Sequence, residues 1–264
     1  MKQYDKNQEQ YIDLLCRAIQ LFYKNDAKVL FDQPHETNKS EATGDGKIVN
    51  ERAMVGCVYR YMWCLMQQRI SEIPESDIDV EYDRMVRGGS EYYEKEISGS
   101  CGERSCGLYS NCIQVIVSEL NRRRKQGNSN ADSGDTTDVI KTAVRPDIIV
   151  HNRNQIGQPN NGLVVEFKKE HKKFCAKDIK FDMAKLNYFT CQDEHTQFHY
   201  KVGAMVVLRS EYADVGVISG KSVLCGYRVC AGGKEKVCDR EIKSALIRKS
   251  SCVPTGLPCC LVNS

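Results

Sequence analysis

The sequence predicts an α/β protein in which helices pack on a mixed β-sheet. Segments with an apolar residue at every third or fourth position predict amphipathic helices, and short runs rich in Val, Ile and Leu predict strands. Polar segments rich in Gly, Pro, Asn and Ser separate these elements and mark turns and loops. The resulting order of helix, strand, strand, strand, helix and strand is typical of layered α/β folds.

The N-terminal part of the chain predicts two helices joined by a polar segment. Residues 8–23 repeat apolar side chains at helical spacing, namely Ile12, Leu15, Ile19 and Phe22. Residues 32–47 are polar, contain Pro and Gly, and predict a loop or linker. Asn50 is a suitable N-cap for a second helix, which carries Glu51 in its first turn. The apolar stripe of this helix consists of Met54, Cys57, Val58, Tyr61, Cys64 and Leu65.

The middle of the chain has weaker patterns. Residues 77–84 alternate as a strand does, and residues 112–120 are apolar and β-branched, which fits a strand or a short helix. Residues 88–110 are rich in Gly, Ser and charge and predict no regular element. Residues 121–138 predict a polar loop whose basic run, 122–125, could touch phosphates, although a solvated charged loop is the favoured interpretation.

The C-terminal part predicts two hairpins with a helix and a strand between them. In residues 144–174 two apolar runs are separated by a polar loop that contains Gly157 and Gly162, so we expect a β-hairpin. A helix follows, because apolar residues recur at helical spacing at Ile179, Met183, Leu186 and Phe189. Residues 200–208 predict a buried strand, and the second hairpin turns at the Ala-Gly-Gly of residues 231–233.

Each strand of the first hairpin carries a carboxylate inside an apolar run. Asp147 begins the first strand and Glu166 lies near the end of the second, so antiparallel pairing brings the two together. Because strand side chains alternate between faces, Glu166 and Lys168 share one face and Phe167 points the opposite way, into the core. We expect the face of Lys168 to be open.

This arrangement points to the chemistry of phosphodiester hydrolysis. Two adjacent carboxylates repel each other unless a cation lies between them, and hard oxygen ligands suit Mg²⁺. Such an ion could polarise a phosphoryl oxygen and lower the pKa of a bound water. Lys168 would orient that water or offset the charge that develops on the phosphate. The competing interpretation is a surface salt bridge between strand-end acids and a lysine.

The composition excludes some classes of protein. The chain has 264 residues, 41% hydrophobic and 28% charged, which is typical of a soluble globular protein. The formal net charge of +3 gives no global field that would demand a nucleic-acid partner. No apolar run is long enough for a signal peptide or a membrane span, so we expect a cytoplasmic protein without a membrane partner.

The 14 cysteines predict neither a disulfide framework nor a zinc site. Disulfides are disfavoured because the expected compartment is reducing and disulfide scaffolds are short chains. The pairs closest to zinc-ligand spacing contain no C-x-x-C, namely Cys101/Cys106, Cys225/Cys230 and His195/His199. Three cysteines among apolar residues are expected to pack as small buried hydrophobes: Cys57, Cys64 and Cys112.

The residues of the first hairpin resemble the signature of the PD-(D/E)xK, or restriction endonuclease-like, nuclease superfamily. Pro146 and Asp147 match its first half, and Glu166-Phe167-Lys168 match its second, 166 − 147 = 19 residues later. Over residues 48–210 the chain is also similar to a group of uncharacterised bacterial proteins. The shared motifs are Asn50–Ala53, Glu81–Arg84, Arg145–His151, Glu166–Lys169 and Asp182–Leu186. Two departures are Asp83, where we expect Asn, and an insertion at about 88–140.

The resemblance implies a restriction endonuclease-like core. Residues 1–47 would be an N-terminal helix and linker, and residues 48–264 the nuclease-like domain. Within that domain the core would span 48–210, with a C-terminal hairpin and tail at 211–264. The resemblance implies a site with Mg²⁺, for which Mn²⁺ substitutes, held by Asp147, Glu166, the Phe167 carbonyl and Glu51, with Lys168 as the catalytic lysine.

The resemblance further implies a metal-dependent endonuclease whose expected substrate is DNA, and by family analogy defence against foreign DNA is one role open to it; the sequence does not decide between DNA and RNA. Basic residues near the second strand of the hairpin are expected to contact nucleic acid: Arg145, Lys169, Lys172, Lys173 and Lys185. A homodimer is an allowed assembly. Two alternatives remain, because members of the superfamily also bind without cutting. The chain could be a non-catalytic nucleic-acid-binding or assembly module, or a structural protein whose acids form salt bridges.

Overall fold

The structure is a computed structural model that describes the chain in separate ranges. These are 6–32, 45–68, 73, 77–79, 96–97, 115–116, 118–119, 142–143, 146–151, 161–170, 176–192, 198–220, 222–238, 241–242, 244 and 246. Several predicted features lie outside the described residues, including most of the linker at 32–47, most of the segment at 88–110 and the loop at 121–138. The described parts of 112–120 are helical, which favours the short helix over the strand.

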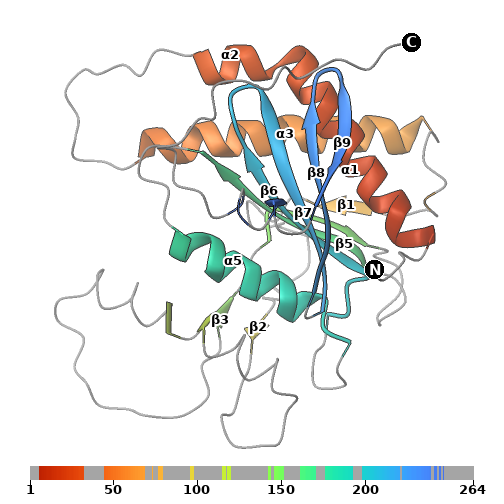
Figure 1. Ribbon diagram of the computed structural model, residues 1–264, viewed down its shortest axis with the longest axis vertical. Helices are drawn as coiled ribbons and strands as arrows, with labels where there is room; N and C mark the ends of the chain where they lie inside the picture. Colours follow the sequence, from red (N-terminus) through yellow and green to blue (C-terminus); the bar gives the residue numbers. More distant parts are fainter. Residues whose placement is uncertain are drawn as a thin grey trace, which may run out of the picture.

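A seven-stranded mixed sheet forms the centre of the molecule, with the strand order β1-β4-β5-β6-β7-β8-β9 (Figure 1). Of its neighbouring pairs, β5 and β6 run parallel and the others antiparallel. The strands are β1 Asp77–Asp79, β4 Ile148–His151, β5 Asn161–Lys169, β6 Val202–Leu208, β7 Tyr212–Ser219, β8 Ser222–Cys230 and β9 Gly233–Val237. Two short strands, β2 Glu96–Ile97 and β3 Thr142–Ala143, pair separately. The predicted α/β class is confirmed.

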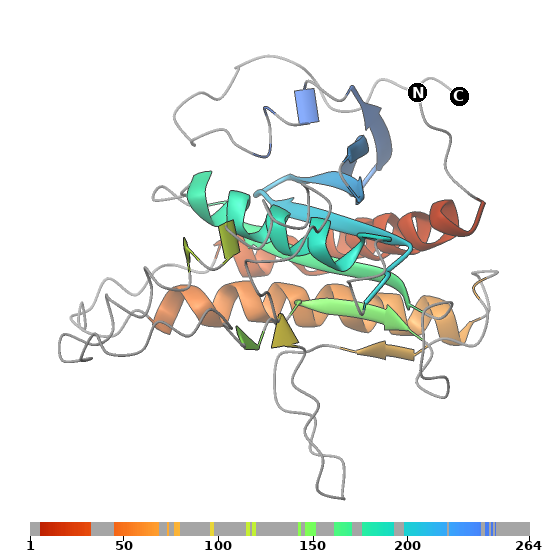
Figure 2. The same cartoon turned by 90° about the horizontal axis from the view of Figure 1, so that it is seen from below.

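Helices cover both faces of the sheet (Figure 2). The helices are α1 Lys6–Asn25, α2 Ala27–Asp32, α3 Asp45–Gln67 and α5 Ala176–Phe189. On one face, alternate side chains of the central strands form a core with α1 and α3. On the other face, the intervening side chains pack against α5. Since α1 shares its core with the sheet, the N-terminal helix is an integral layer of the fold.

The two predicted hairpins form, and both faces of β5 follow strand alternation. Ile148 of β4 pairs with Val165 of β5, and β8 turns into β9 at residues 231–232. Phe167 is fully buried on the α1 and α3 side. Gly162 belongs to β5 rather than to the loop that precedes it. A Cβ at this position would lie 2.2 Å from the ring of Tyr11, so a larger residue would force the Tyr11 side chain of α1 to shift.

The second helix differs in two ways from its prediction. It begins at Asp45, so Asn50 is not its N-cap and Glu51 lies beyond its first turn. Asn in a helix interior costs well under about 1 kcal/mol, so a good capping residue does not force a helix to start. The buried stripe of α3 contains Val55 and Met62, whereas Cys64 is exposed. The sequence is apolar on two adjacent stripes, and packing against α1 selects one of them.

Strand β7 was not predicted, because Asp214 and Gly216 interrupt its apolar pattern. Both residues are explained by neighbours that are distant in sequence. Two arginines pair with the carboxylate of Asp214, and a Cβ on Gly216 would lie 2.7 Å from the side chain of Leu246. A local pattern therefore could not distinguish this buried strand from a loop.

Two further expectations concern the burial of the cysteines and membrane-spanning helices. Cys57 is half-buried and Cys64 exposed, so the prediction that both are buried hydrophobes is wrong for Cys64. Cys112 lies outside the described residues. Within the described ranges, no helix is both long enough and apolar enough to cross a membrane.

Candidate active site

Asp147 lies immediately before β4, against the edge of β5. Ile148, the first residue of β4, pairs with Val165 of β5. The Asp147 amide donates to the Val165 carbonyl oxygen at 3.0 Å, and its carboxylate Oδ2 accepts from the Phe167 amide at 2.7 Å. The side chain of Asp147 is thereby fixed against the main chain of β5, just where β4 begins.

Glu51 reaches the same edge of β5 from helix α3. Its Oε2 accepts a hydrogen bond from the Lys169 amide at 3.0 Å. The N–H and C=O of one strand residue point to the same side of the strand, so the Phe167 carbonyl also lies on this edge. It stands between the amide that binds Asp147 and the amide that binds Glu51. Three of the predicted metal ligands are therefore brought to one strand edge.

The face of β5 that carries Glu166 and Lys168 is covered by α5. Lys185 Nζ lies 2.6 Å from Glu166 Oε1 and 2.8 Å from Asp182 Oδ1, and Lys168 Nζ lies 2.8 Å from Asp182 Oδ2. These four alternating charges, Glu166, Lys185, Asp182 and Lys168, form an ion-pair ladder between the strand and the helix. The spacings i, i+2 on a strand and i, i+3 on a helix put each pair on one face.

The expectation that the Lys168 face is open is wrong. The side chain of Lys168 is 24% exposed, and Glu166 is only 2% exposed. The physical reason is α5, whose Asp182 and Lys185 neutralise the strand charges and so allow this face to be covered. Sequence reasoning missed Asp182 as a site residue, although it stands three residues before Lys185 in the motif that carried the resemblance.

Burial dominates the electrostatics of the carboxylates. Desolvation raises the pKa of Asp147 to about 6, although the Phe167 amide and Lys168 lower it. Desolvation also raises the pKa of Glu166 well above its usual value, and Lys185 opposes this. Burial opposes the charge of Asp182 as well, but Lys185 and Lys168 together lower its pKa. The ladder thus keeps Asp182 ionised in a place where an isolated carboxylate would be costly.

The charges of the described groups in this region do not balance when all of them are ionised. The ladder is neutral by itself, but Asp147 and Glu51 add two carboxylates, so the six groups sum to 2 − 4 = −2. Lys169 adds positive charge near Glu51, while its ammonium lies 5.1 Å from the centre of the Phe31 ring. Among the described residues, a deficit of one to two charges remains when all the carboxylates are ionised, and one divalent cation would offset it.

The donor set fits Mg²⁺ in type and in number. Carboxylates and a main-chain carbonyl are the hard oxygen ligands that Mg²⁺ prefers, and it commonly uses one or two carboxylates with several waters. In the described ranges, no group of three or more His, Cys, Asp or Glu side chains converges as a ready-made metal site. An ion here would therefore depend on two carboxylates, the Phe167 carbonyl and water.

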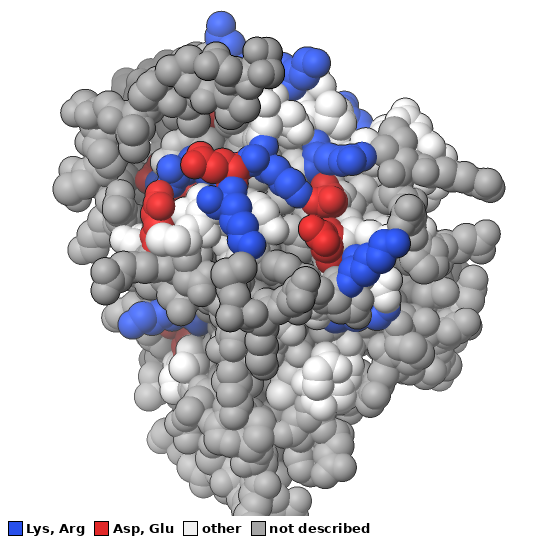
Figure 3. All heavy atoms as spheres, turned by 45° about the vertical axis from the view of Figure 1, so that its right-hand side comes forward, with Lys and Arg blue, Asp and Glu red and all other residues white. Residues whose placement is uncertain are grey.

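The residues that were predicted to contact nucleic acid differ in their exposure and in whether the structure describes them. We expected Lys185 to contact phosphate groups, but it is 6% exposed and paired with Glu166, so this expectation is wrong. Lys169 is half-buried, and Arg145, Lys172 and Lys173 lie outside the described residues. On the face drawn in Figure 3, the described basic side chains are interspersed with acidic ones, so no basic stripe is visible there.

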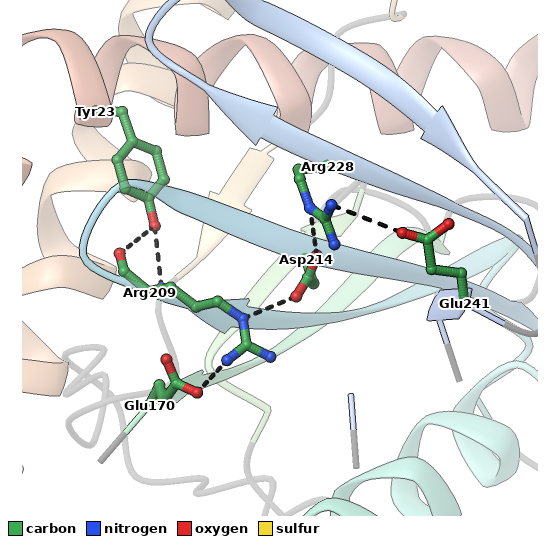
Figure 4. A network of polar contacts seen from close by, with 6 residues as sticks. All are labelled: Tyr23, Glu170, Arg209, Asp214, Arg228 and Glu241. Carbon is green, nitrogen blue, oxygen red and sulfur yellow. Dashed lines mark hydrogen bonds and ion pairs between the residues drawn. The ribbon is translucent and has the colours of Figure 1, made fainter. Parts of the chain in front are cut away.

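A second buried polar network anchors the end of β5 (Figure 4). Arg209, which follows β6, binds Glu170 and lies 2.8 Å from Asp214 of β7. Asp214 is fully buried and also pairs with Arg228 of β8 at 3.2 Å. The Tyr23 hydroxyl of α1 donates to the Arg209 carbonyl at 2.8 Å. Because Glu170 is two residues beyond Lys168, this network holds the site strand against its neighbours.

Comparisons of the chain with models of protein families, with curated proteins and with solved structures found no match.

Proposed function

We propose that the protein is a metal-dependent nuclease of the PD-(D/E)xK type that hydrolyses phosphodiester bonds, with DNA as the preferred substrate. The observation that carries the proposal is the meeting of Asp147, Glu51 and the Phe167 carbonyl at one edge of β5, beside Glu166 and Lys168. The excess negative charge at this edge supports a divalent cation, and the hydrogen bonds that fix both carboxylates support preorganised ligands.

The topology around the site agrees with the proposed restriction endonuclease-like core. Asp147 immediately precedes β4, Glu166 lies on the neighbouring antiparallel strand β5, and α5 then comes before the parallel strand β6. This is the order of elements that the motif resemblance predicts. The start of β4 and the end of β5 would then frame one site.

The proposed roles follow from the charges. Asp147, Glu51 and the Phe167 carbonyl would hold Mg²⁺, and Glu166 would join them once it is released from Lys185. The ion would polarise a phosphoryl oxygen and lower the pKa of a bound water. Burial opposes the charge of Lys168, but Asp182 and Glu51 raise its pKa. Lys168 therefore stays an ammonium ion and cannot accept a proton from water. Its role is to offset the negative charge that develops on the phosphate.

The ion-pair ladder favours a second candidate function. Glu166 and Lys168 are both engaged in ion pairs with α5, which is consistent with a nucleic-acid-binding or assembly module without catalysis. In that case the acids would serve the packing of α5 on the sheet. The two functions differ in whether removing a metal ligand changes chemistry or only stability.

DNA cleavage separates the candidates. Supercoiled plasmid and linear DNA, with an RNA substrate in parallel, are incubated with wild type in Mg²⁺, Mn²⁺ or EDTA. We expect cutting only with the metals, and its loss in Asp147→Asn, which retains a hydrogen-bond acceptor for the Phe167 amide. The control is Glu211→Gln, an exposed acid outside the site. Wild type that binds DNA but never cuts it would establish the binding module, and wild type that does neither would leave a structural protein.

A further inference from the structure

Lys185 occupies a position that a lysine rarely tolerates. It is 6% exposed, and burial lowers the tendency of its ammonium to stay charged. Its two carboxylate partners, Glu166 and Asp182, compensate for this loss of water. Lysine is found at such buried sites mainly when it is paired with an acid, so the burial of Lys185 depends on these two contacts.

Glu166 depends on Lys185 in return. It is 2% exposed, it lies near the negative charges of Asp182 and Asp147, and within the described residues its Oε1 meets no polar group other than the Lys185 ammonium. In the proposed site Glu166 is also a ligand of the divalent cation. The ammonium and the dication would then compete for one buried carboxylate, because two cations on it would repel each other.

Asp182 makes an exchange between the two cations feasible. It already binds Lys185 at 2.8 Å, so Lys185 retains a partner if Glu166 is given up. Neither cation is left buried and unpaired during such an exchange, and this avoids the largest electrostatic cost. The i, i+3 spacing of the two residues on α5 keeps that second contact in place.

We propose that Lys185 is the resident counter-ion of Glu166, which holds this carboxylate in the metal-free protein and is displaced from it by the divalent cation. The inference rests on the proposed metal site. It makes Lys185 a positioning residue that limits metal affinity, and not a nucleic-acid contact. It also links metal binding to a small rearrangement at the centre of α5.

Metal titration tests this without DNA. Mn²⁺ binding to the metal-free protein is measured at pH 8 by calorimetry and by electron paramagnetic resonance. Lys185→Met, Glu166→Gln and their double variant are compared with wild type. The matched control is Lys180→Met, which removes an exposed lysine from the same helix. We expect Lys185→Met to bind Mn²⁺ on the order of tenfold more tightly, and the control to bind as wild type does.

The double variant separates direct exchange from a long-range charge effect. In the Glu166→Gln background, removing Lys185 should change Mn²⁺ affinity by less than about threefold, since the shared carboxylate is gone. An equal gain in both backgrounds, or unchanged or weaker binding by Lys185→Met, would overturn the inference. If Lys185→Met does not fold, ¹⁵N resonances of lysine ammonium groups in wild type provide the test. One protected signal should change on addition of Mg²⁺, and an unchanged spectrum at saturation would refute the exchange.

The outcome for Lys185 is distinguishable from the outcome for the nuclease. Wild type that cuts DNA, with no affinity gain in Lys185→Met, would reject the exchange and leave the nuclease in place. Tighter Mn²⁺ binding by Lys185→Met, with no cleavage by any variant, would reject the nuclease and leave the exchange in place. Absence of Mn²⁺ binding in all variants would overturn the exchange outright.

Discussion

Substitutions at two adjacent positions of β5 should separate the core face of this strand from its site face. Phe167 is fully buried among the residues that join β5 to α1 and α3, so Phe167→Ala should lower the free energy of unfolding by about 3–5 kcal/mol. The change removes a large side chain from a packed core and leaves the charges of the site in place. Cleavage by the folded fraction should persist.

Lys168→Met should have the opposite profile. The variant keeps most of the aliphatic stem but removes the ammonium, 2.8 Å from Asp182. Asp182 still has Lys185 at 2.8 Å, so it is not left without a cation. The loss should be that of one charged hydrogen bond, about 1.5–3 kcal/mol, which exceeds the roughly 1 kcal/mol of an exposed pair. Cleavage should be abolished or greatly slowed, because the proposed mechanism needs the Lys168 ammonium to offset charge on the phosphate.

Urea unfolding followed by far-UV circular dichroism measures both stabilities, and plasmid cleavage measures activity. Lys180→Met on α5 is the control, with an expected change within about 0.5 kcal/mol. A Phe167→Ala protein as stable as wild type would refute the assignment of strand faces. A Lys168→Met protein that cuts as well as wild type would refute the proposed mechanism, whatever its stability.

Three further predictions concern the rest of the molecule. Asp214→Ala should lower the free energy of unfolding by about 3–5 kcal/mol, because it leaves two arginines without their shared buried carboxylate. The control is Glu241→Gln, which removes a half-exposed carboxylate 3.7 Å from Arg228 and should cost under about 1 kcal/mol. Equal losses for the two variants in urea unfolding would contradict this prediction. Burial raises the pKa of Asp147 from 3.8 to about 6, so in EDTA the fold should lose up to about 3 kcal/mol as pH rises from about 4 to 6. Asp147→Asn should lack this part of the loss, and parallel pH curves for the two proteins would argue against it. Alkylation at pH 8 should modify exposed Cys64 but spare Cys16, whose pKa burial raises to about 12; peptide mass spectrometry reads this out, and rapid labelling of Cys16 in the native protein would contradict its burial.

The sequence by itself determined the elements whose patterns are local. The apolar spacing of residues 8–23 predicted α1, and the alternation around Glu166 predicted both the hairpin and the burial of Phe167. Antiparallel pairing of the two strands then brought Asp147, just before β4, to the end of β5 that carries Glu166. These inferences succeeded because periodicity reports which side of an element is buried, and because a hairpin joins residues that are near in sequence.

Only the tertiary structure decided which groups meet across the layers. The partners of Glu166 and Lys168 are Lys185 and Asp182 on α5, and a charge on a helix does not reveal from its own position whether it faces solvent or a buried acid. The burial of Asp214 in β7 likewise depends on arginines from two other segments. Burying a charge is favourable only with a partner, and that partner is supplied by packing between elements, which no local pattern encodes.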